Sequence, residues 1–309
     1  MAAYAESAPG DPDIIELRSL GARELDPLLL EETVEWEQEL DWDFSRSAEL
    51  VRKYAGMRAL GGAALVDRGE VAGYGYCVIE DHKGLIGDLY IRPGWRRGDA
   101  EVRLFRMMLD NLIATPPVRR IESQLMLIGP AVAKALQRER FVRLFERILM
   151  RFEGSAPMPP ARSQRHRQFR VEAWGDHHHD EASGVIALAY DGHIDSQIND
   201  QYRTFAGARR FLYNIVQYPG CGEFYRKASF VATELGTGSV AGIVLTSFVG
   251  PEVAHITQLC VAPRAQGAGL GYEMLRRAVS GLQAGGAKRI SLTVTAANST
   301  AVELYERCG

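Results

Sequence analysis

The sequence has few cysteines, and they are not spaced as in a metal-binding or disulfide-stabilised protein. The four of them, Cys77, Cys221, Cys260 and Cys308, are scattered, and no two have the C-x-x-C spacing. Such thiols are typical of reduced, mostly buried cysteines in a cytoplasmic protein. Residues 1–6 also lack the basic stretch and apolar run of a secretory signal, so we expect a cytoplasmic location.

Long apolar runs and a strong charge of one sign are missing as well. No run of about 18 apolar residues occurs, so no membrane-spanning helix is expected. The 36 basic and 39 acidic residues give a net charge of −3, which provides no case for a nucleic-acid-binding surface. With 46% apolar and 24% charged residues, the chain is predicted to be soluble and globular, and its 309 residues suggest two domains.

Two common nucleotide-binding loops are also absent from the glycine-rich turn Gly267–Gly271. A P-loop needs Lys followed by Ser or Thr after its last glycine, whereas Gly271 is followed by Tyr272 and Glu273. The dinucleotide-binding pattern G-x-G-x-x-G fails too, because the glycines here fall as G-x-G-x-G.

What the sequence does contain is a strand, a glycine-rich turn and a helix start in direct succession. The stretch Val261–Gly271 reads VAPRAQGAGLG; it follows the alternating apolar run His255–Val261 and opens an apolar-periodic helix, Leu270–Ala284. Unpaired N–H groups at the positive end of a helix dipole favour an anionic group, most often a phosphate. Glycine lets that group approach the backbone. A tight turn that uses glycine only for packing is the alternative.

A second informative patch lies near the end of the chain. The alternating strand Arg289–Thr295 is followed by the segment Asn298–Gly309, which reads NSTAVELYERCG. Asn298 is placed to cap the helix that follows. Ala301 and Tyr305, four residues apart, share one face of that helix.

Together, the two patches resemble the two signatures of the GNAT acyltransferases. Gln266–Gly271 is similar to the pattern Q-x-x-G-x-G that follows V-x-P, and Asn298–Tyr305 is similar to N-x-x-A-x-x-L-Y. The resemblance implies an α/β (α+β) fold, in which helices flank a central mixed, mostly antiparallel sheet. It also implies acetyl-CoA as a co-substrate and no metal.

The resemblance further implies which residues hold the donor. In this family the fourth and fifth strands splay apart, and the pantetheine arm would enter there along the backbone of Leu259–Val261. The pyrophosphate would bind the loop amides, and Asn298 would add a side-chain contact to the arm. The predicted donor site therefore comprises Leu259, Cys260, Val261, Gln266, Gly267, Ala268, Gly269, Leu270, Gly271 and Asn298.

Acyl transfer from a thioester to an amine needs an acid for the thiolate and a base for the amine. Tyr305 is the candidate acid, because a phenol with a pKa near 10 is protonated at pH 7 and can donate to a thiolate of pKa about 8.5. His255 is the candidate base, with Thr257 on the same strand face to hold a water. Glu252 and Glu234 are weaker substitutes. In the alternative interpretations, Tyr305 is an aromatic residue of the core, and His255 is a histidine at a strand edge whose hydrogen bonds are satisfied.

The first half of the chain repeats the element order of the second. Val71 stands 169 residues before Val240, and Pro93 stands 170 residues before Pro263. A nearly constant offset indicates two copies of one fold. We therefore predict domains at residues 1–152 and 169–309, joined by a Pro-rich, basic linker at 153–168 that acts as a tether or contacts an acidic surface.

The two copies differ where the chemistry would take place. Asp99 and Glu101 stand where the second copy has its glycines 269 and 271, and two carboxylates would repel a pyrophosphate. Leu85 and Leu136 stand opposite the candidate base and acid. The first copy is therefore predicted to be degenerate, with a structural or substrate-shaping role; a CoA site of altered form is the alternative.

Two further features depart from a simple repeat. The second copy stops at Gly309 without closing strands, so it is expected to be either truncated or completed by another segment, whereas the first copy continues through a last strand at Phe141–Phe152. The run His177–His179 invites a metal interpretation, but consecutive residues point in different directions. We expect a solvated loop or helix start there.

The sequence thus predicts a tandem protein whose C-terminal copy moves an acetyl group from acetyl-CoA to an amine acceptor by direct attack. A non-catalytic acyl-CoA-binding or scaffolding protein is the alternative, because the first copy has lost its site and the second lacks its closing strands.

Overall fold

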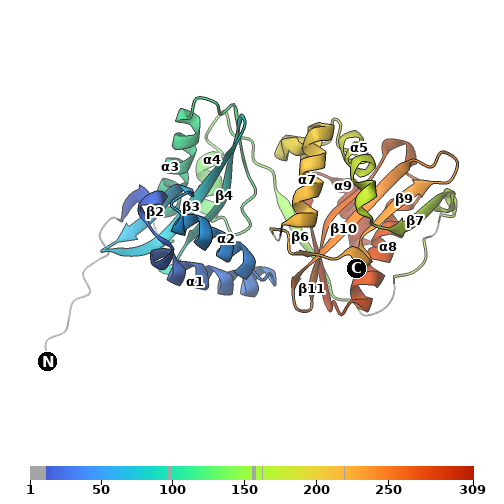
Figure 1. Cartoon of the computed structure of the whole chain (residues 1–309), viewed down its shortest axis with the longest axis horizontal. Helices are drawn as coiled ribbons and strands as arrows, with labels where there is room; N and C mark the ends of the chain where they lie inside the picture. Colours follow the sequence, from blue (N-terminus) through green and yellow to red (C-terminus); the bar gives the residue numbers. More distant parts are fainter. Residues whose placement is uncertain (1–11, 97–98, 155–157, 162, 219) are drawn as a thin grey trace. The chain divides into compact units, whose positions relative to one another are not determined.

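The structure, a computed structural model, describes residues 12–309 apart from 97–98, 155–157, 162 and 219 (Figure 1). The chain divides into two compact units, of which unit 1 contains residues up to 40 and 44–144, and unit 2 contains residues 41–43 and 145–309. Each unit has its own sheet with helices beside it, which confirms the predicted fold class. None of the helices described here is long and apolar enough to cross a membrane.

Unit 1 is built on a five-stranded sheet in the order β1-β2-β3-β4-β5. Its neighbours are antiparallel except for β4 and β5, which run parallel. The strands are β1 Asp13–Glu16, β2 Gly61–Asp67, β3 Glu70–Glu80, β4 Lys83–Ile91 and β5 Arg120–Ser123.

Helices cover both faces of this first sheet. One core lies between the sheet and α1 and α2, and another lies between the sheet and α3 and α4. Helix α3 shows the reason, because Leu104, Met108 and Leu112 recur every four residues and all are buried. The helices are α1 Ala22–Leu40, α2 Ser45–Gly56, α3 Ala100–Ala114 and α4 Pro130–Leu136, with short 3-10 turns at Leu17–Ser19 and Pro93–Trp95.

Unit 2 contains a seven-stranded sheet in the order β6-β12-β11-β10-β9-β7, with β8 beside β10. Only β11 and β12 are parallel neighbours. The strands are β6 Arg147–Phe152, β7 Phe169–Ala173, β8 Glu223–Phe224, β9 Phe230–Glu234, β10 Val240–Gly250, β11 Val253–Val261 and β12 Arg289–Thr295.

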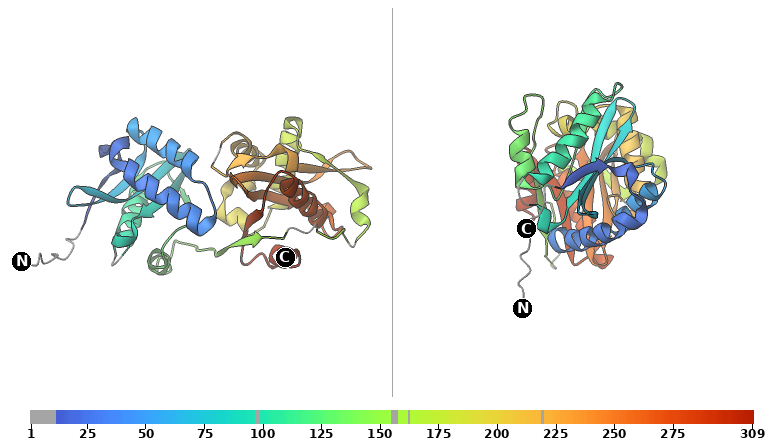
Figure 2. Two further views of the ribbon diagram at one scale, coloured as in Figure 1. Left: turned by 90° about the horizontal axis from the view of Figure 1, so that it is seen from below. Right: turned by 90° about the vertical axis from the view of Figure 1, so that its left-hand side faces the viewer.

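The helices of unit 2 also lie on both faces of their sheet, as Figures 1 and 2 show. Helix α8 packs on one face through Met274, Leu275 and Ala278, and helices α5 and α7 pack on the other through Ile186 and Leu212. The helices are α5 His179–Ala189, α6 Asp195–Ile198, α7 Phe205–Gln217, α8 Leu270–Ala284 and α9 Ser299–Glu306. The 3-10 turns are Arg165–Gln168, Asp176–His178, Asp200–Arg203, Arg226–Ala228 and Pro263–Ala265.

Strand β6 belongs to the second sheet, although the sequence places it at the end of the first half. It pairs antiparallel with β12 from Ile290 opposite Phe152 to Thr295 opposite Arg147, and the boundary between the compact units falls after Leu144. Without β6, strand β12 would be an open edge beside the core. Strand β6 thus lies beside β12, at the edge where the sequence of the second copy provides no closing strand.

Part of the segment expected to be a linker, residues 153–168, packs against the core of unit 2. Met158 and Ala161 are buried, and Met158 joins the core under α8. The Tyr272 hydroxyl donates to the carbonyl oxygen of Pro159 at 2.8 Å. Its apolar side chains thus cover the core, so this stretch is not the free tether that its proline content indicated.

Unit 1 buries two carboxyl groups beside one phenol. Glu32 on α1 is 1% exposed and Asp88 on β4 is 7% exposed. The Tyr74 hydroxyl lies 2.7 Å from Glu32 Oε2 and 3.2 Å from Asp88 Oδ2. Burial raises the pKa of Glu32 well above its usual value and that of Asp88 to about 6. The folded pair therefore holds a proton that the unfolded chain would release at neutral pH.

This pair predicts that stability falls as the pH rises. A carboxyl group whose pKa is higher in the folded state contributes fully to stability when the pH is below its pKa in the unfolded chain, near 4. That contribution to stability is lost as the pH rises through the folded pKa values, about 6 for Asp88 and well above the usual value for Glu32. The free energy of unfolding should drop on the order of 2 kcal/mol between pH 4.5 and pH 8. Urea unfolding followed by circular dichroism measures it.

The matched variants are Glu32→Gln and Glu49→Gln, the second at an exposed position on α2. Glu32→Gln should flatten the pH dependence, because glutamine does not titrate, whereas Glu49→Gln should keep the wild-type slope. Equal slopes in all three proteins would show that the buried pair does not share a proton.

Candidate functional site

Strands β11 and β12 are paired along only part of their length. Their parallel pairing runs from Val253 opposite Arg289 to Ile256 opposite Leu292, but β11 continues to Val261 and β12 to Thr295. We call these two continuations, residues 257–261 and 293–295, which do not pair with each other, the splay. Since main-chain groups at the end of a ladder need other partners, the splay offers backbone donors and acceptors to a ligand.

A β-bulge accompanies the splay. In the β10–β11 ladder, Leu245 faces Gln258 and Thr246 faces Ile256, which leaves Thr257 as the extra residue. A bulge bends its strand and increases the local twist. The Thr257 hydroxyl donates to the carbonyl oxygen of Leu245 at 3.0 Å, so in this structure it braces the bulge.

The glycine-rich loop follows β11 and opens helix α8, as the sequence indicates. Gly267 and Gly269 have φ angles of 71° and 80°, which side chains other than glycine rarely adopt. A Cβ added to Gly267 would meet no atom within 4 Å, so the space beside the loop is open there. The arrangement fits a phosphate at the helix start.

One residue beside this loop, Ser163, has no local sequence pattern that marks it. A Cβ on Gly269 would lie 3.3 Å from the Cβ of Ser163, which precedes β7. The Ser163 Oγ accepts a hydrogen bond from the Arg165 main-chain N–H at 3.2 Å. Ser163 was hidden because it falls in the stretch that its composition marks as a linker.

Helix α9 brings Tyr305 to the splay. Asn298 caps the helix, with its Oδ1 accepting from the Ala301 N–H at 3.3 Å. The Tyr305 ring packs against the core under α8. Burial, and then the charge of Asp195, raise the pKa of Tyr305 to about 12, with a smaller effect of Cys260. Tyr305 lines a cavity of about 50 Å³ together with Ile256 and Leu292, the last paired residues of β11 and β12, so its ring lies where the splay begins. With its pKa raised, the phenol stays protonated at pH 7.

His255 lies in the paired part of β11, just before the splay. Its Nδ1 is 2.8 Å from the Ser291 Oγ on β12, and the side chain is 8% exposed. Burial, and then the positive charge of Arg147, lower the pKa of His255 to about 4. The imidazole is therefore uncharged at neutral pH and only weakly basic.

Polar side chains gather on the face of the sheet opposite α8. The Gln258 Nε2 donates to the Tyr190 hydroxyl at 3.0 Å, and the Thr295 Oγ1 donates to Asp195 Oδ1 at 2.5 Å. Sequence reasoning missed Gln258, Tyr190 and Asp195, because they come from β11, the residue after α5 and the start of α6, and share no local pattern.

The other expected candidates lie elsewhere. Glu252 forms an ion pair with Lys288 at 2.6 Å, and Glu234 forms one with Arg264 at 3.6 Å. The run His177–His179 straddles a 3-10 turn and the start of α5. In the part of the chain that the structure describes, no group of three or more His, Cys, Asp or Glu side chains is placed to hold a metal ion.

Unit 1 repeats the splay but not the loop. The β4–β5 pairing ends at Ile86 opposite Ser123 while β4 continues to Ile91, again beside a bulge. At its helix start, Glu101 accepts a hydrogen bond from the Gly129 N–H at 2.7 Å. Arg96, the counterpart of Gln266, forms two hydrogen bonds of 2.6 Å with Glu35. Glu35 thus engages the guanidinium of Arg96, and the carboxylate of Glu101 lies in the first turn of α3, where a phosphate would have to bind.

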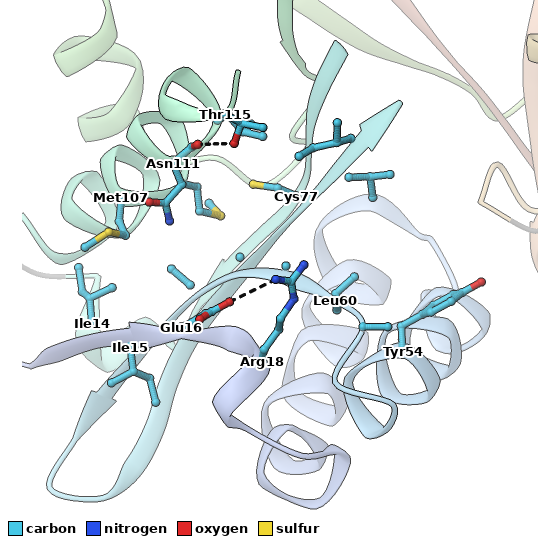
Figure 3. A pocket seen from close by; sticks show the side chains of 18 residues that line it. Ile14, Ile15, Glu16, Arg18, Tyr54, Leu60, Cys77, Met107, Asn111 and Thr115 are labelled. Carbon is cyan, nitrogen blue, oxygen red and sulfur yellow. Dashed lines mark hydrogen bonds and ion pairs between the residues drawn. The ribbon is translucent and has the colours of Figure 1, made fainter. Parts of the chain in front are cut away.

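A cavity of about 850 Å³ in unit 1 lies away from these residues (Figure 3). Apolar side chains such as Ile14 and Met107 line it, together with the ion pair between Arg18 and Glu16 at 3.5 Å. None of the predicted site residues takes part, so its size alone does not make it the functional site.

Comparison with known proteins agrees with this geometry. A family profile described as "Acetyltransferase (GNAT) family" matches residues 145–309. No curated protein sequence matches the chain.

Three solved structures are similar over nearly the whole chain. A GCN5-related N-acetyltransferase from Sphaerobacter thermophilus is 15% identical, with 98% of this chain and 93% of that chain covered and a TM-score of 0.65. A GCN5-related glucosamine N-acetyltransferase region of a fungal multi-domain GH3 β-N-acetylglucosaminidase is 14% identical, with 99% and 37% covered and a TM-score of 0.64. A tandem GNAT protein from the clavulanic acid biosynthesis pathway is 14% identical, with 96% and 93% covered and a TM-score of 0.57. At these identities, the likeness concerns the fold.

Proposed function

Because the chain belongs to the acetyltransferase (GNAT) family, we propose that its second unit transfers an acetyl group from acetyl-CoA to an amine acceptor. The observation that carries the proposal is the succession of splay, glycine-rich loop and Tyr305 at one end of β11. Unit 1 has the splay without the loop or the phenol, so we assign the reaction to unit 2 alone.

Donor binding follows from the main chain. The N–H groups from Gln266 to Gly271 would hold the pyrophosphate at the start of α8, where the helix dipole favours negative charge. The edge of β11 that does not pair with β12, at Leu259, Cys260 and Val261, would hydrogen-bond the amides of the pantetheine arm. Asn298, at the start of α9, would contact the arm from the other side of the splay.

The reaction is a direct attack. The amine nitrogen forms a bond to the acyl carbon, the carbon–sulfur bond breaks, and Tyr305 gives its proton to the departing thiolate. Proton transfer is efficient when donor and acceptor have similar pKa values. Burial raises the pKa of Tyr305 to about 12, so the phenol holds its proton at pH 7 until the departing thiolate, a stronger base than the thioester sulfur, has formed.

His255 is the candidate base. Its Nδ1 is held by Ser291, so a proton from the acceptor would pass to Nε2. With a pKa of about 4, the imidazole is too weak to deprotonate a free ammonium group. It suits a later step, after the new carbon–nitrogen bond has made the nitrogen positively charged and more acidic.

The test is a pair of measurements on the whole chain. Titration calorimetry with acetyl-CoA should show one bound molecule per chain, and a thiol-release assay over a panel of amines should show turnover. The absence of any acetyl-CoA binding would contradict the proposal. Two bound molecules would contradict the assignment to unit 2, and binding without turnover would favour a non-catalytic acyl-CoA-binding protein.

A further inference from the structure

One carboxylate is hydrogen-bonded to the last residue of β12, at the open end of the splay, and has no role in the steps above. Asp195 is the first residue of α6, in the connection between α5 and α7. Its Oδ1 accepts a hydrogen bond of 2.5 Å from the Thr295 hydroxyl, at the last residue of β12. The Asp195 side chain is 16% exposed. It is thus largely buried and fixed in place by the strand that forms one side of the splay.

The charge of this carboxylate acts on the group that we assign as the acid. It is the second cause, after burial, of the raised pKa of Tyr305. It also contributes to the raised pKa values of Tyr190 and Tyr202, for which burial is again the first cause. The negative charge of Asp195 therefore acts on three phenols, one of them the candidate acid.

Aromatic rings lie beside His193, the ion-pair partner of Asp195. Tyr190 and Tyr202 stack with ring centroids 4.3 Å apart, and the His193 ring meets Tyr190 edge-on at 5.2 Å. The Tyr190 hydroxyl already accepts a hydrogen bond from Gln258. Carboxylate and phenol oxygens beside aromatic rings match a primary ammonium group, which has three N–H donors and no acceptor.

In the part of the chain that the structure describes, the ion pair found for this carboxylate is with a histidine. His193 Nδ1 lies 3.8 Å from Asp195 Oδ2, and it carries charge only when protonated. Arg147 stands opposite Thr295 in the β6–β12 ladder, where it is exposed and acts on His255 and Tyr202. The hydrogen-bond donor to Asp195 is the neutral hydroxyl of Thr295. Burying a charged group costs free energy unless a group of opposite charge pairs with it, so a cationic ligand would stabilise this carboxylate.

We propose that Asp195 is the acceptor-binding carboxylate, which receives the ammonium group of a protonated aliphatic amine beside the acyl group. The inference rests on the proposed acetyl transfer and names its acceptor class. Asp195 would hold the cation until one proton leaves to solvent; the nitrogen then attacks, and the products are the N-acetyl amine and free CoA. In total, a protonated amine and acetyl-CoA give amide, CoA thiol and one released proton.

The experiment compares two amines that differ by one methylene, benzylamine and aniline. Benzylamine is protonated at pH 7.5, whereas aniline is neutral. Asp195→Asn keeps the shape of the side chain and an oxygen acceptor for Thr295 but removes the charge. We expect its KM for benzylamine to rise at least about tenfold, with the dissociation constant of acetyl-CoA and the kcat/KM for aniline within about twofold of wild type.

The control is Asp191→Asn, an exposed carboxylate in the turn after α5, which should leave every constant unchanged. Asp195→Glu keeps the charge and should recover part of the benzylamine activity, so it tests the idea even if Asp195→Asn folds poorly. Equal losses with benzylamine and aniline, or weaker acetyl-CoA binding, would overturn the proposal and make Asp195 a structural link between α6 and β12.

The failure of this inference differs from the failure of the proposed function. If wild-type protein does not bind acetyl-CoA, the proposed function is wrong. If it binds acetyl-CoA but acetylates aniline with the same kcat/KM as benzylamine, the acceptor class is wrong and the donor site stands. The same conclusion follows if it acetylates neither of these amines nor 1,5-diaminopentane, a second protonated aliphatic amine.

Discussion

Tyr305→Phe is expected to lower kcat about 100- to 1,000-fold and to leave the dissociation constant of acetyl-CoA nearly unchanged. The ring would still pack under α8, since only the hydroxyl is lost. Without that hydroxyl, the thiolate must leave unprotonated or take a proton from water. Steady-state kinetics for turnover and calorimetry for binding separate the two effects.

The control for this substitution is Tyr213→Phe, at an exposed tyrosine on α7. It should change neither constant. If Tyr305→Phe weakened acetyl-CoA binding as much as it lowered turnover, the phenol would be part of the donor site or the core and not the acid.

Gly269→Asp is expected to weaken acetyl-CoA binding by about 100-fold or more. The change introduces into the loop the residue that unit 1 has at the matching position, Asp99. It places a carboxylate beside the pyrophosphate, puts a side chain at a φ of 80° and brings a Cβ to 3.3 Å from Ser163. A loss of 100-fold corresponds to about 2.7 kcal/mol, and calorimetry measures it directly.

Two further variants separate charge from backbone strain. Gly269→Ala has the strain without the charge, so it should bind more tightly than Gly269→Asp, and the difference should shrink in high salt. Gly238→Asp has a similar φ of 72° in an open turn between β9 and β10 and should bind as wild type does. Unchanged binding by Gly269→Asp would mean that the pyrophosphate does not bind this loop.

Local sequence patterns were sufficient for the elements around the splay. The predicted helix Leu270–Ala284 and the predicted strand Arg289–Thr295 have the observed bounds of α8 and β12. Apolar periodicity of 3.6 or 2 residues and the glycine-rich turn are properties of neighbouring residues, so a single sequence contains them. The N-cap role of Asn298 was predictable for the same reason.

Long-range pairing was not predictable in this way. The alternation in Arg147–Phe152 marks a strand but does not say which sheet it joins, and the structure pairs it with β12. Asp195 and Thr295 are 100 residues apart, and only the fold brings the carboxylate to the hydroxyl. Ser163 reaches the loop because its segment packs on unit 2, which composition could not reveal.

The position of β6 limits how the two halves of the chain can be separated. A deletion of the first half that ends at the predicted linker would also remove the neighbour of β12, and with it one side of the sheet that holds the splay. The second half is therefore not an independent folding unit that starts where its own repeat starts. Loss or exchange of the first half during evolution would have to spare residues 145–152, so the first copy cannot be removed at the repeat boundary without its last strand.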